Sequence, residues 1–292
     1  MSKFRPIEHR YQVNDFHMVG NGFRVLNFFP NGNSLAQRLN PFVLLDYNPA
    51  HYFPPTQVPP GVGAHPHRGF ETVTIAYQGS VAHHDSAGNE GVIEAGDVQW
   101  MTAGSGVLHK EYHEKEFASR GGLLQMVQLW VNLPEQNKMT APHYQPLRKQ
   151  DMGWVTLDNH QGTVKIIAGE YAGIKGPART HTPINLFDVR LATTGLIHLD
   201  LPAHFNTAVL VLEGDVTFNQ SDKVSKNNLI VFENAPGKIL IENGFNPATV
   251  LLLSAESLNE PIAHYGPFVM NTQEQLHQAL LDYKSGKFGH LE

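Results

Sequence analysis

The sequence predicts an all-β protein made of two similar barrels in tandem, followed by one α-helix at the C-terminal end. Runs of β-branched and other apolar residues alternate with turn residues along most of the chain, which contains 26 Gly and 19 Pro among 292 residues. Residues 208–218 repeat the pattern of residues 73–83: each segment is an apolar strand, a turn with Gly and a return strand, and Gly214 lies 135 positions after Gly79. Two copies of one barrel are the simplest explanation of this repeat.

The chain is long enough for two domains that each bury a core of their own. Residues 134–150 are polar and contain three prolines, which makes them the best linker candidate. We therefore expect an N-terminal barrel over residues 1–140. A C-terminal barrel should occupy residues 141–292 and end in the helix.

Composition limits the partners of this protein. Charged residues make up 16% of the chain, against a usual share of about 25%, and the formal net charge of −6 comes without a basic run. Direct binding to nucleic acid or to a membrane is therefore not expected. Because the chain has no cysteine, any metal must be held by histidine and carboxylate. The first residues show no apolar signal segment and no apolar run could span a bilayer, so we expect a cytoplasmic protein. We also expect it to be a monomer.

Local patterns predict the individual elements in chain order. The proline-rich residues 53–63 should form a surface or rim segment, because Pro cannot donate to a central ladder. Near the end, Asn271 and Thr272 with Gln275 fit a capping box, and Gly286 suits the end of the helix that follows. This helix should pack its apolar stripe on a barrel. The predicted strands are residues 22–29, 41–45, 72–77, 91–94, 98–102, 122–133, 228–232 and 238–242.

Two residue pairs predict a metal site in the N-terminal barrel. His65 and His67 are separated by one residue, as are His109 and Glu111. In a strand, residues i and i+2 point to the same face, so each pair can aim two ligands at one point. The strands and turns between the pairs provide enough antiparallel chain to bring both pairs together inside one barrel.

Each pair alone is weak evidence, because a chain with 17 histidines contains about one His-x-His by chance. The context is stronger, since both pairs lie on strand-like segments separated by hairpins. The second pair also follows a Gly-rich turn at residues 103–106, which permits close approach of the backbone. The alternative is that His65, His67 and His109 are hydrogen-bonded core histidines.

The second barrel lacks the same set of ligands. The positions 135 residues after His65 and His67 are Asp200 and Pro202, and no histidine occurs around residue 244. His198 and Asp200 form a stray pair without a second cluster. We therefore expect residues 141–292 to bind no metal.

Four segments carry a family resemblance: HPHRGFET (65–72), GDVQWMTAGSGVLHKE (96–111), VQLWVNLP (127–134) and GPFVMNT (266–272). Together they resemble the pirin family of the cupin superfamily, over nearly the whole chain. The resemblance implies two cupin barrels, each a double-stranded β-helix or jelly roll, with one metal in the N-terminal barrel. In pirins three histidines and a glutamate hold the metal, and they map onto His65, His67, His109 and Glu111. The first cupin motif usually also has a glutamate, here Glu71, but in pirins the carboxylate ligand comes from the second motif.

The resemblance implies quercetin 2,3-dioxygenase activity, in which dioxygen cleaves the heterocycle of a flavonol and carbon monoxide is released. Three histidines and one carboxylate suit one divalent transition metal and leave two octahedral positions open for substrate and dioxygen. Iron(II) is the expected metal, with Mn, Co, Ni, Cu or Zn as alternatives, because availability in the cell decides among them. Glu111 is the expected catalytic base for the flavonol 3-hydroxyl, being the nearby ionised acceptor.

One departure and one rival function accompany this resemblance. Pirins commonly have Gly-Arg-Gly where this chain has Gly104, Ser105 and Gly106, so any role of that arginine is missing. Some pirins are described as regulators that bind a protein partner and sense the redox state of the metal. A regulator needs a partner surface and a closed cavity, whereas an enzyme needs an open apolar cleft. Phe70 and Trp100 are candidates for lining such a cleft, although each is by default a core residue.

Overall fold

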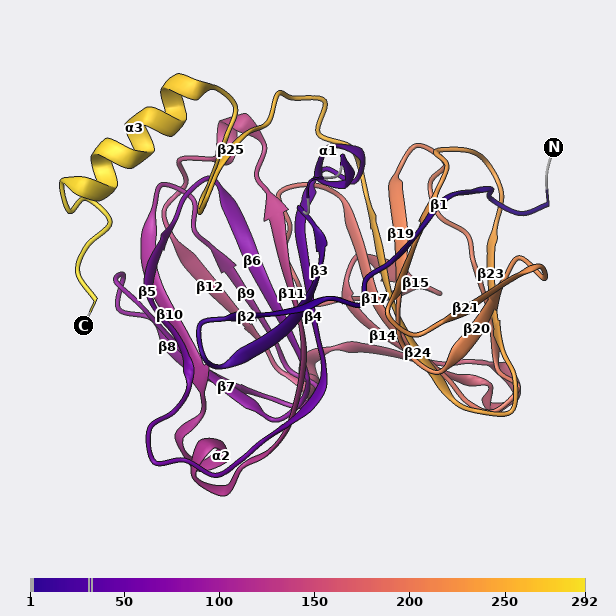
Figure 1. The fold of residues 1–292 in the computed structure, drawn as a ribbon. Helices are drawn as coiled ribbons and strands as arrows, with labels where there is room; N and C mark the ends of the chain where they lie inside the picture. Colours follow the sequence, from indigo (N-terminus) through magenta and orange to yellow (C-terminus); the bar gives the residue numbers. More distant parts are fainter. Residues whose placement is uncertain (1–2, 31, 33, 292) are drawn as a thin grey trace. The chain divides into compact units, whose positions relative to one another are not determined.

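The computed structural model describes residues 3–30, 32 and 34–291, which form two compact β units and a C-terminal helix. This architecture confirms the predicted all-β fold with two barrels (Figure 1). The first barrel, as named from here on, contains described residues of 15–37, 41–149 and 258–291. The second barrel contains residues 3–14, 38–40 and 150–257.

Within the described residues, two antiparallel sheets build the first barrel. Its large sheet has the strand order β12-β9-β6-β11-β4-β3-β2, and its small sheet has the order β5-β10-β7-β8. The predicted strands of the first half all correspond to these elements, to within one residue at each end that was predicted beyond them. Their bounds are β2 Phe16–Val19, β3 Phe23–Phe29, β4 Phe42–Phe53, β5 Gly61–His67, β6 Phe70–Gln78, β7 Ser80–Asp85, β8 Glu90–Glu94, β9 Val98–Thr102, β10 Val107–His113, β11 Gly122–Asn132 and β12 His143–Leu147.

The second barrel has the same plan. Among its described residues, the large sheet has the order β1-β22-β19-β24-β17-β14-β13 and the small sheet has the order β18-β23-β20-β21. A separate ribbon pairs β15 with β16. The bounds are β1 Ile7–Gln12, β13 Gly153–Thr156, β14 Gly162–Ala168, β15 Glu170–Tyr171, β16 Ile174–Lys175, β17 Ile184–Leu191, β18 Leu196–Leu199, β19 Asn206–Glu213, β20 Asp215–Phe218, β21 Asp222–Ser225, β22 Asn228–Phe232, β23 Ile239–Asn243 and β24 Ala248–Ala255.

The sequence repeat corresponds to equivalent hairpins in the two barrels. Gly79 separates β6 from β7 with φ 82°, and Gly214 separates β19 from β20 with φ 75°. Both turns need a residue that accepts a left-handed conformation without steric cost, and glycine does so. The repeat predicted from residues 73–83 and 208–218 is therefore present as the same strand, turn and strand.

Apolar side chains fill the interior of the second barrel. Ile166, Phe187, Val209, Ile230 and Leu252 are fully buried in one cluster that draws on several strands of the large sheet. Side chains alternate across a strand, so every second residue of these strands faces the cluster. Each buried aliphatic or aromatic side chain contributes about 1.5–3 kcal/mol relative to an exposed one.

The two barrels are interleaved along the chain, unlike the expected division at residues 140 and 141. Strand β1 pairs antiparallel with β22, with Arg10 opposite Ile230, so the first strand completes the large sheet of the second barrel (Figure 1). The last segment, residues 258–291, packs with the first barrel instead of the second. The physical reason is long-range strand pairing and helix docking, which local composition does not encode.

The predicted linker at residues 134–150 contains an edge strand. Strand β12 pairs with β9, with Pro146 opposite Gln99, and so extends the large sheet of the first barrel. A proline is tolerated there because an edge strand needs hydrogen bonds on one side only. The prediction that the whole stretch is a linker is therefore wrong for residues 143–147.

The C-terminal helix α3 (Gln273–Lys284) forms as predicted and packs on the first barrel. Thr272 and Gln275 make the capping box, and Gly286 follows the helix with φ 77°. Leu276 and Ala279 are buried against Phe268 of β26 and its neighbours. Further elements are α1 Leu35–Arg38, α2 Lys115–Arg120, β25 Ala263–Tyr265, β26 Phe268–Met270 and 3₁₀ turns at Glu135–Asn137, Lys149–Asp151 and Asp158–His160.

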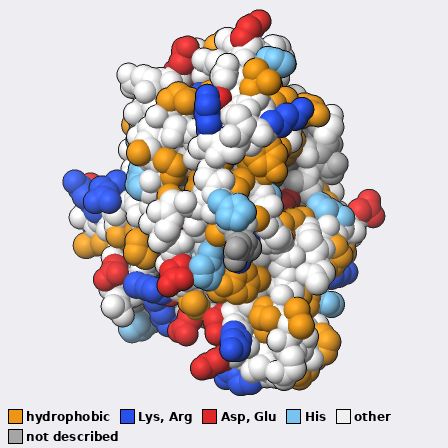
Figure 2. Space-filling model, turned by 90° about the vertical axis from the view of Figure 1, so that its left-hand side faces the viewer, with side chains coloured by type: hydrophobic (Ala, Val, Ile, Leu, Met, Phe, Trp, Pro, Cys, Tyr) orange, Lys and Arg blue, Asp and Glu red, His pale blue; other side chains and the backbone are white. Residues whose placement is uncertain are grey.

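Helices are short throughout the described chain, and none of them has the length and apolarity to cross a membrane. On the face shown in Figure 2, Lys and Arg side chains are dispersed among acidic and hydrophobic ones. This dispersal agrees with the absence of basic runs from the sequence.

Candidate metal centre

The strands β5 and β10 place the predicted ligands on one wall of the first barrel. They pair antiparallel, with His65 directly opposite His109 and His67 opposite Val107. His65 and His67 share a face because one residue separates them, and His109 joins them from the neighbouring strand. A register shift between His109 and Glu111 then places Glu111 opposite Val62.

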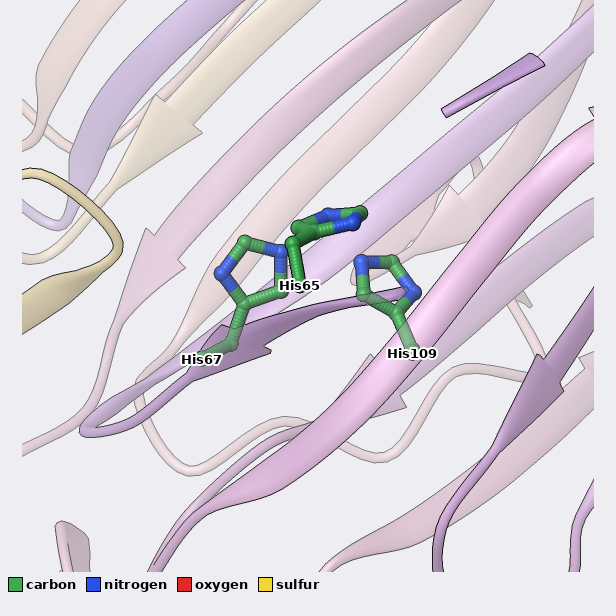
Figure 3. Close-up of side chains that lie close together, drawn as sticks. All are labelled: His65, His67 and His109. Atoms are coloured by element: carbon green, nitrogen blue, oxygen red, sulfur yellow. The ribbon is translucent and has the colours of Figure 1, made fainter. Parts of the chain in front are cut away.

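Three imidazole rings converge at this wall (Figure 3). The ring centroids of His65 and His109 are 4.3 Å apart, those of His67 and His109 are 4.6 Å apart, and those of His65 and His67 are 4.7 Å apart. One ligand nitrogen from each ring lies within 4.8 Å of the others, and this is the one group of its kind in the described part of the chain. Such spacing allows three nitrogens to bind one ion.

His67 and His109 are buried, His65 is partly buried, and several of the ring nitrogens are left unpaired. Both ring nitrogens of His109 and Nδ1 of His67 have no hydrogen-bond partner among the described residues. Nδ1 of His65 lies 2.8 Å from the carbonyl oxygen of Gly63. Core histidines that serve only packing are normally hydrogen-bonded, so unpaired buried nitrogens fit a bound ion better than the alternative of structural histidines.

Burial holds the three imidazoles in the neutral form that metal ligands need. It lowers the pKa of His65, with the Gly63 carbonyl acting in the opposite direction. Burial lowers the pKa of His67 and His109 much further, and the neighbouring histidines add to this effect. Neutral imidazole offers a lone pair to a transition metal without first losing a proton.

Glu111 lies beside this cluster but is not one of the residues that form it in the described structure. Its buried carboxyl group faces the same pocket as His65 and His67, and Thr74 Oγ1 donates to its Oε1 at 3.3 Å. Burial raises the pKa of Glu111 to about 7, against the opposing effect of the Thr74 hydroxyl. This side chain would have to move towards the three imidazoles to act as a fourth ligand.

An open pocket of about 390 Å³ leads to the cluster. Its walls come from alternate residues of β3, β4 and β11, which all face the barrel interior. The walls are mainly apolar, and the buried amide of Asn48 has no hydrogen-bond partner among the residues described. The wall residues include Phe23, Val25, Leu44, Asp46, Asn48, Met126, Gln128 and Trp130.

The aromatic wall of the pocket differs from the candidates chosen from the sequence. Phe70 and Trp100 are fully buried core residues, which was the alternative to a position in the wall of the cleft. Trp130 lines the pocket instead, stacks on Phe70 with ring centroids 4.2 Å apart, and lies 5.1 Å from the His67 ring. The i, i+2 spacing of Met126, Gln128 and Trp130 could have identified this wall.

The other motif residues support the site indirectly. Glu71 is buried and accepts a 2.6 Å hydrogen bond from Thr102, and burial raises its pKa to about 7 despite the opposing hydrogen bonds. Like Glu111, it is outside the histidine cluster of the described chain. At the Gly-rich turn, a Cβ on Gly106 would lie 2.5 Å from the Phe288 ring, so glycine is required for this close approach.

His198 and Asp200 are both exposed on the second barrel. The interior of that barrel is filled by its apolar cluster. The stray pair therefore faces solvent. That residues 141–292 bind no metal remains a prediction.

Comparison with known proteins gives a consistent result for the whole chain. The profile of the family described as Pirin matches residues 22–131, and the profile described as Pirin C-terminal cupin domain matches residues 186–289. A Pseudomonas aeruginosa protein provisionally named as a quercetin 2,3-dioxygenase is 48% identical over 272 residues, which cover 93% of this chain and 94% of the relative. Human pirin is 34% identical over 262 residues, covering 88% of this chain and 86% of pirin.

A solved structure gives the same result. The crystal structure of quercetin 2,3-dioxygenase from Acinetobacter baumannii matches with a TM-score of 0.95 and 46% identity. The match covers 99% of this chain and 100% of the chain in that structure. Both barrels of the fold are therefore shared with that protein.

Proposed function

Because this chain belongs to the pirin family, we propose that it is a metal-dependent dioxygenase that cleaves flavonols such as quercetin with dioxygen and releases carbon monoxide. The observation that carries this proposal is that two members of the histidine cluster, His65 and His67, line an open, mainly apolar pocket. A volume of about 390 Å³ is within the usual range for small-molecule sites of roughly 300–1,000 Å³. The two most similar proteins described above carry quercetin 2,3-dioxygenase names.

His65, His67 and His109 would hold the metal, and Glu111 would serve as the fourth ligand. The unpaired buried nitrogens and the absence of cysteine fit a divalent transition metal with nitrogen and oxygen ligands. We propose iron(II), with Mn, Co, Ni, Cu and Zn as the alternatives that metal analysis would distinguish. When bound, the metal would supply Lewis acidity and a route for electrons to dioxygen.

Glu111 would also accept the proton of the flavonol 3-hydroxyl. Its carboxyl group faces the pocket that the substrate must enter, and it accepts a hydrogen bond from Thr74 of the other sheet. Burial raises the pKa of Glu111 and so makes its carboxylate a better proton acceptor, whereas a bound cation beside it would act in the opposite direction. General-base catalysis of this kind typically contributes about 10²- to 10⁴-fold in rate.

The pocket walls would bind and orient the substrate. Trp130 offers the face of a half-buried indole to a flat polyphenol ring, and the apolar residues around it exclude water. The unpaired amide of Asn48 can both donate to and accept from a flavonol hydroxyl. An enzyme that binds an aromatic polyphenol needs this combination of an aromatic wall and a few polar groups.

Metal analysis followed by oxygen uptake tests the proposal. Protein purified without added metal is analysed for bound metals, reconstituted with each candidate, and mixed with quercetin while oxygen and carbon monoxide are measured. We expect one equivalent of carbon monoxide per oxygen consumed with at least one metal. Metal-loaded protein that binds quercetin but consumes no oxygen would contradict the enzymatic function and favour the redox-sensing regulator, whose protein partner would then have to be sought.

A further inference from the structure

A buried carboxyl group that the proposed reaction does not yet use lines the metal pocket. Asp46 lies on β4 and is 9% exposed. Leu44, Asp46 and Asn48 alternate along this strand, so all three side chains contribute to the same wall of the pocket. A carboxylate is costly to bury in a mainly apolar wall unless hydrogen-bond donors pair with it. The donors that Asp46 has, and those that it lacks, therefore indicate what this pocket binds.

One oxygen of the Asp46 carboxyl group is hydrogen-bonded and the other is free in the described part of the chain. Asn27, which lies opposite Asp46 on β3, donates from its Nδ2 to Oδ1 at 2.7 Å. Oδ2 makes no hydrogen bond with a described residue and is not completely buried, so it is accessible from the pocket. Burial raises the pKa of Asp46 to about 6, against the hydrogen bond from Asn27 and the electrostatic effect of His17. At neutral pH the group is mainly ionised and offers one free acceptor.

The side-chain amide of Asn48 is a second free polar group on the same wall. Asn48 is 3% exposed, and neither its amide oxygen nor its amide nitrogen has a partner among the residues described. An ionised carboxylate can only accept a hydrogen bond, whereas an amide both donates and accepts. A ligand that pairs with Asp46 must therefore bring a donor. Phenolic hydroxyl groups meet this requirement, and the rings that carry them suit the apolar parts of the wall.

Asp46 lies apart from the carboxyl group proposed as the base. Asp46, Gln128 and Thr74 are directly opposite one another on the neighbouring strands β4, β11 and β6. Because adjacent strands are about 4.8 Å apart, the backbone of Asp46 lies roughly 10 Å from that of Thr74 along the sheet. Thr74 is the residue that donates to Glu111. A substrate of two or three connected rings therefore fits the distance between the two carboxyl groups better than a single ring does.

We propose that Asp46 is a specificity-determining residue, which accepts a hydrogen bond from a flavonol hydroxyl group remote from the 3-hydroxyl and so selects polyhydroxylated flavonols. Asn27 positions Asp46 by occupying Oδ1, which leaves Oδ2 for the substrate. A flavonol without such a hydroxyl group leaves the buried carboxylate without this donor. Hydrogen bonds to charged groups typically change affinity about 10- to 100-fold. The inference rests on the proposed flavonol substrate, but it concerns binding and not turnover.

Binding measured without oxygen separates this inference from the dioxygenase proposal. The metal-loaded protein is titrated anaerobically by calorimetry with quercetin and with 3-hydroxyflavone, which keeps the 3-hydroxyl group and lacks the others. We expect the wild type to bind quercetin at least tenfold more tightly. Equal binding of the two flavonols would overturn the inference even if the protein consumes oxygen with quercetin. A tenfold preference in a protein that consumes no oxygen with any metal would support the inference and contradict the dioxygenase activity alone.

Asp46→Asn tests whether Asp46 causes the preference. The substitution keeps the shape of the side chain and an oxygen for Asn27, but it replaces the free acceptor with an amide donor. Quercetin should therefore bind at least tenfold more weakly, whereas 3-hydroxyflavone should bind as before. Asp15→Asn makes the same exchange at an exposed position in the first barrel and should leave both affinities unchanged. A folded Asp46→Asn protein that keeps the wild-type preference for quercetin would refute the assignment.

NMR of the wild-type protein decides the question if Asp46→Asn does not fold. The protein is labelled with ¹³C at the aspartate carboxyl carbons and loaded with zinc(II), which is diamagnetic. The Asp46 carboxyl resonance should shift strongly with saturating quercetin and little with saturating 3-hydroxyflavone. A resonance that responds equally to both flavonols, or to neither, would overturn the proposal.

Discussion

The first and second barrels share a layout of one large and one small sheet, but they differ in what occupies the interior. The second barrel is filled with apolar side chains such as Phe187 and Ile230. The first barrel instead holds the histidine cluster, the buried Glu111 and an open pocket. The same barrel fold can therefore have an interior that mainly stabilises it or an interior that contains a binding site. In the first barrel, polar side chains and open volume replace apolar core contacts that would stabilise the fold.

The largest expected effect comes from removing a histidine of the cluster. His65→Ala, His67→Ala or His109→Ala should each abolish most metal binding and oxygen uptake, because the ion then loses one of its three nitrogen ligands. The protein should stay folded, since the apolar cores do not include these residues. Metal analysis and circular dichroism measure the two properties. Full metal occupancy in all three variants would refute the site assignment.

Glu111→Gln should have the next largest effect, and it separates the ligand role from the base role. If Glu111 is also the base, the metal-loaded variant should bind quercetin and turn over about 10²- to 10⁴-fold more slowly. The measurement is oxygen consumption per bound metal, which corrects for any loss of metal. Turnover per metal near the wild-type level would exclude the base role and leave the dioxygenase function intact.

Phe232→Ala examines the stabilising role of the second barrel. Phe232 is fully buried and packs edge-to-face against Phe218, so its truncation should lower the free energy of unfolding by about 3–5 kcal/mol. Phe245→Ala is the matched control, since Phe245 is 88% exposed in the same barrel and its loss should cost at most about 0.5 kcal/mol. Denaturant unfolding measures both. Equal effects of the two substitutions would contradict the stabilising role of the apolar core of the second barrel.

The smallest effect is expected at the stray pair of the second barrel. His198→Ala should change neither metal content nor oxygen uptake, because His198 is exposed and its neighbour Asp200 faces solvent as well. Metal analysis of His198→Ala and His109→Ala, carried out side by side, compares the two positions directly. A stoichiometric loss of metal from His198→Ala would show that the second barrel also binds an ion.

Local patterns in the sequence predicted the elements that depend on neighbouring residues. The alternating strands, the glycine turns at Gly79 and Gly214, and the capping box of Thr272 are each encoded within a few residues. The same holds for the histidine pairs, because i and i+2 share a face in any strand. The convergence of His65, His67 and His109 followed from the hairpins between them.

Features that depend on residues far apart in the chain could not be predicted from local sequence patterns. The pairing of β1 with β22 joins segments more than two hundred positions apart, and nothing in residues 7–12 specifies that partner. Pro146 argued for a linker, although an unpaired strand edge tolerates it. Trp130 lies in the predicted strand at residues 122–133, but its exposure to the pocket depends on how the opposite wall of the barrel is filled.

The interleaving of the two barrels constrains how this chain folds during its synthesis. Strand β1 is synthesised more than two hundred residues before its partner β22, and the first barrel is packed by α3, which is synthesised after the whole second barrel. Proteins with separate consecutive domains fold their N-terminal domain while the rest is still being translated. Here the second barrel cannot be completed before β22 has been synthesised, and the first barrel cannot be completed before residues 258–291 have been. A nascent chain stalled near residue 140 would therefore present unpaired strand edges to other chains and depend on chaperones to prevent aggregation.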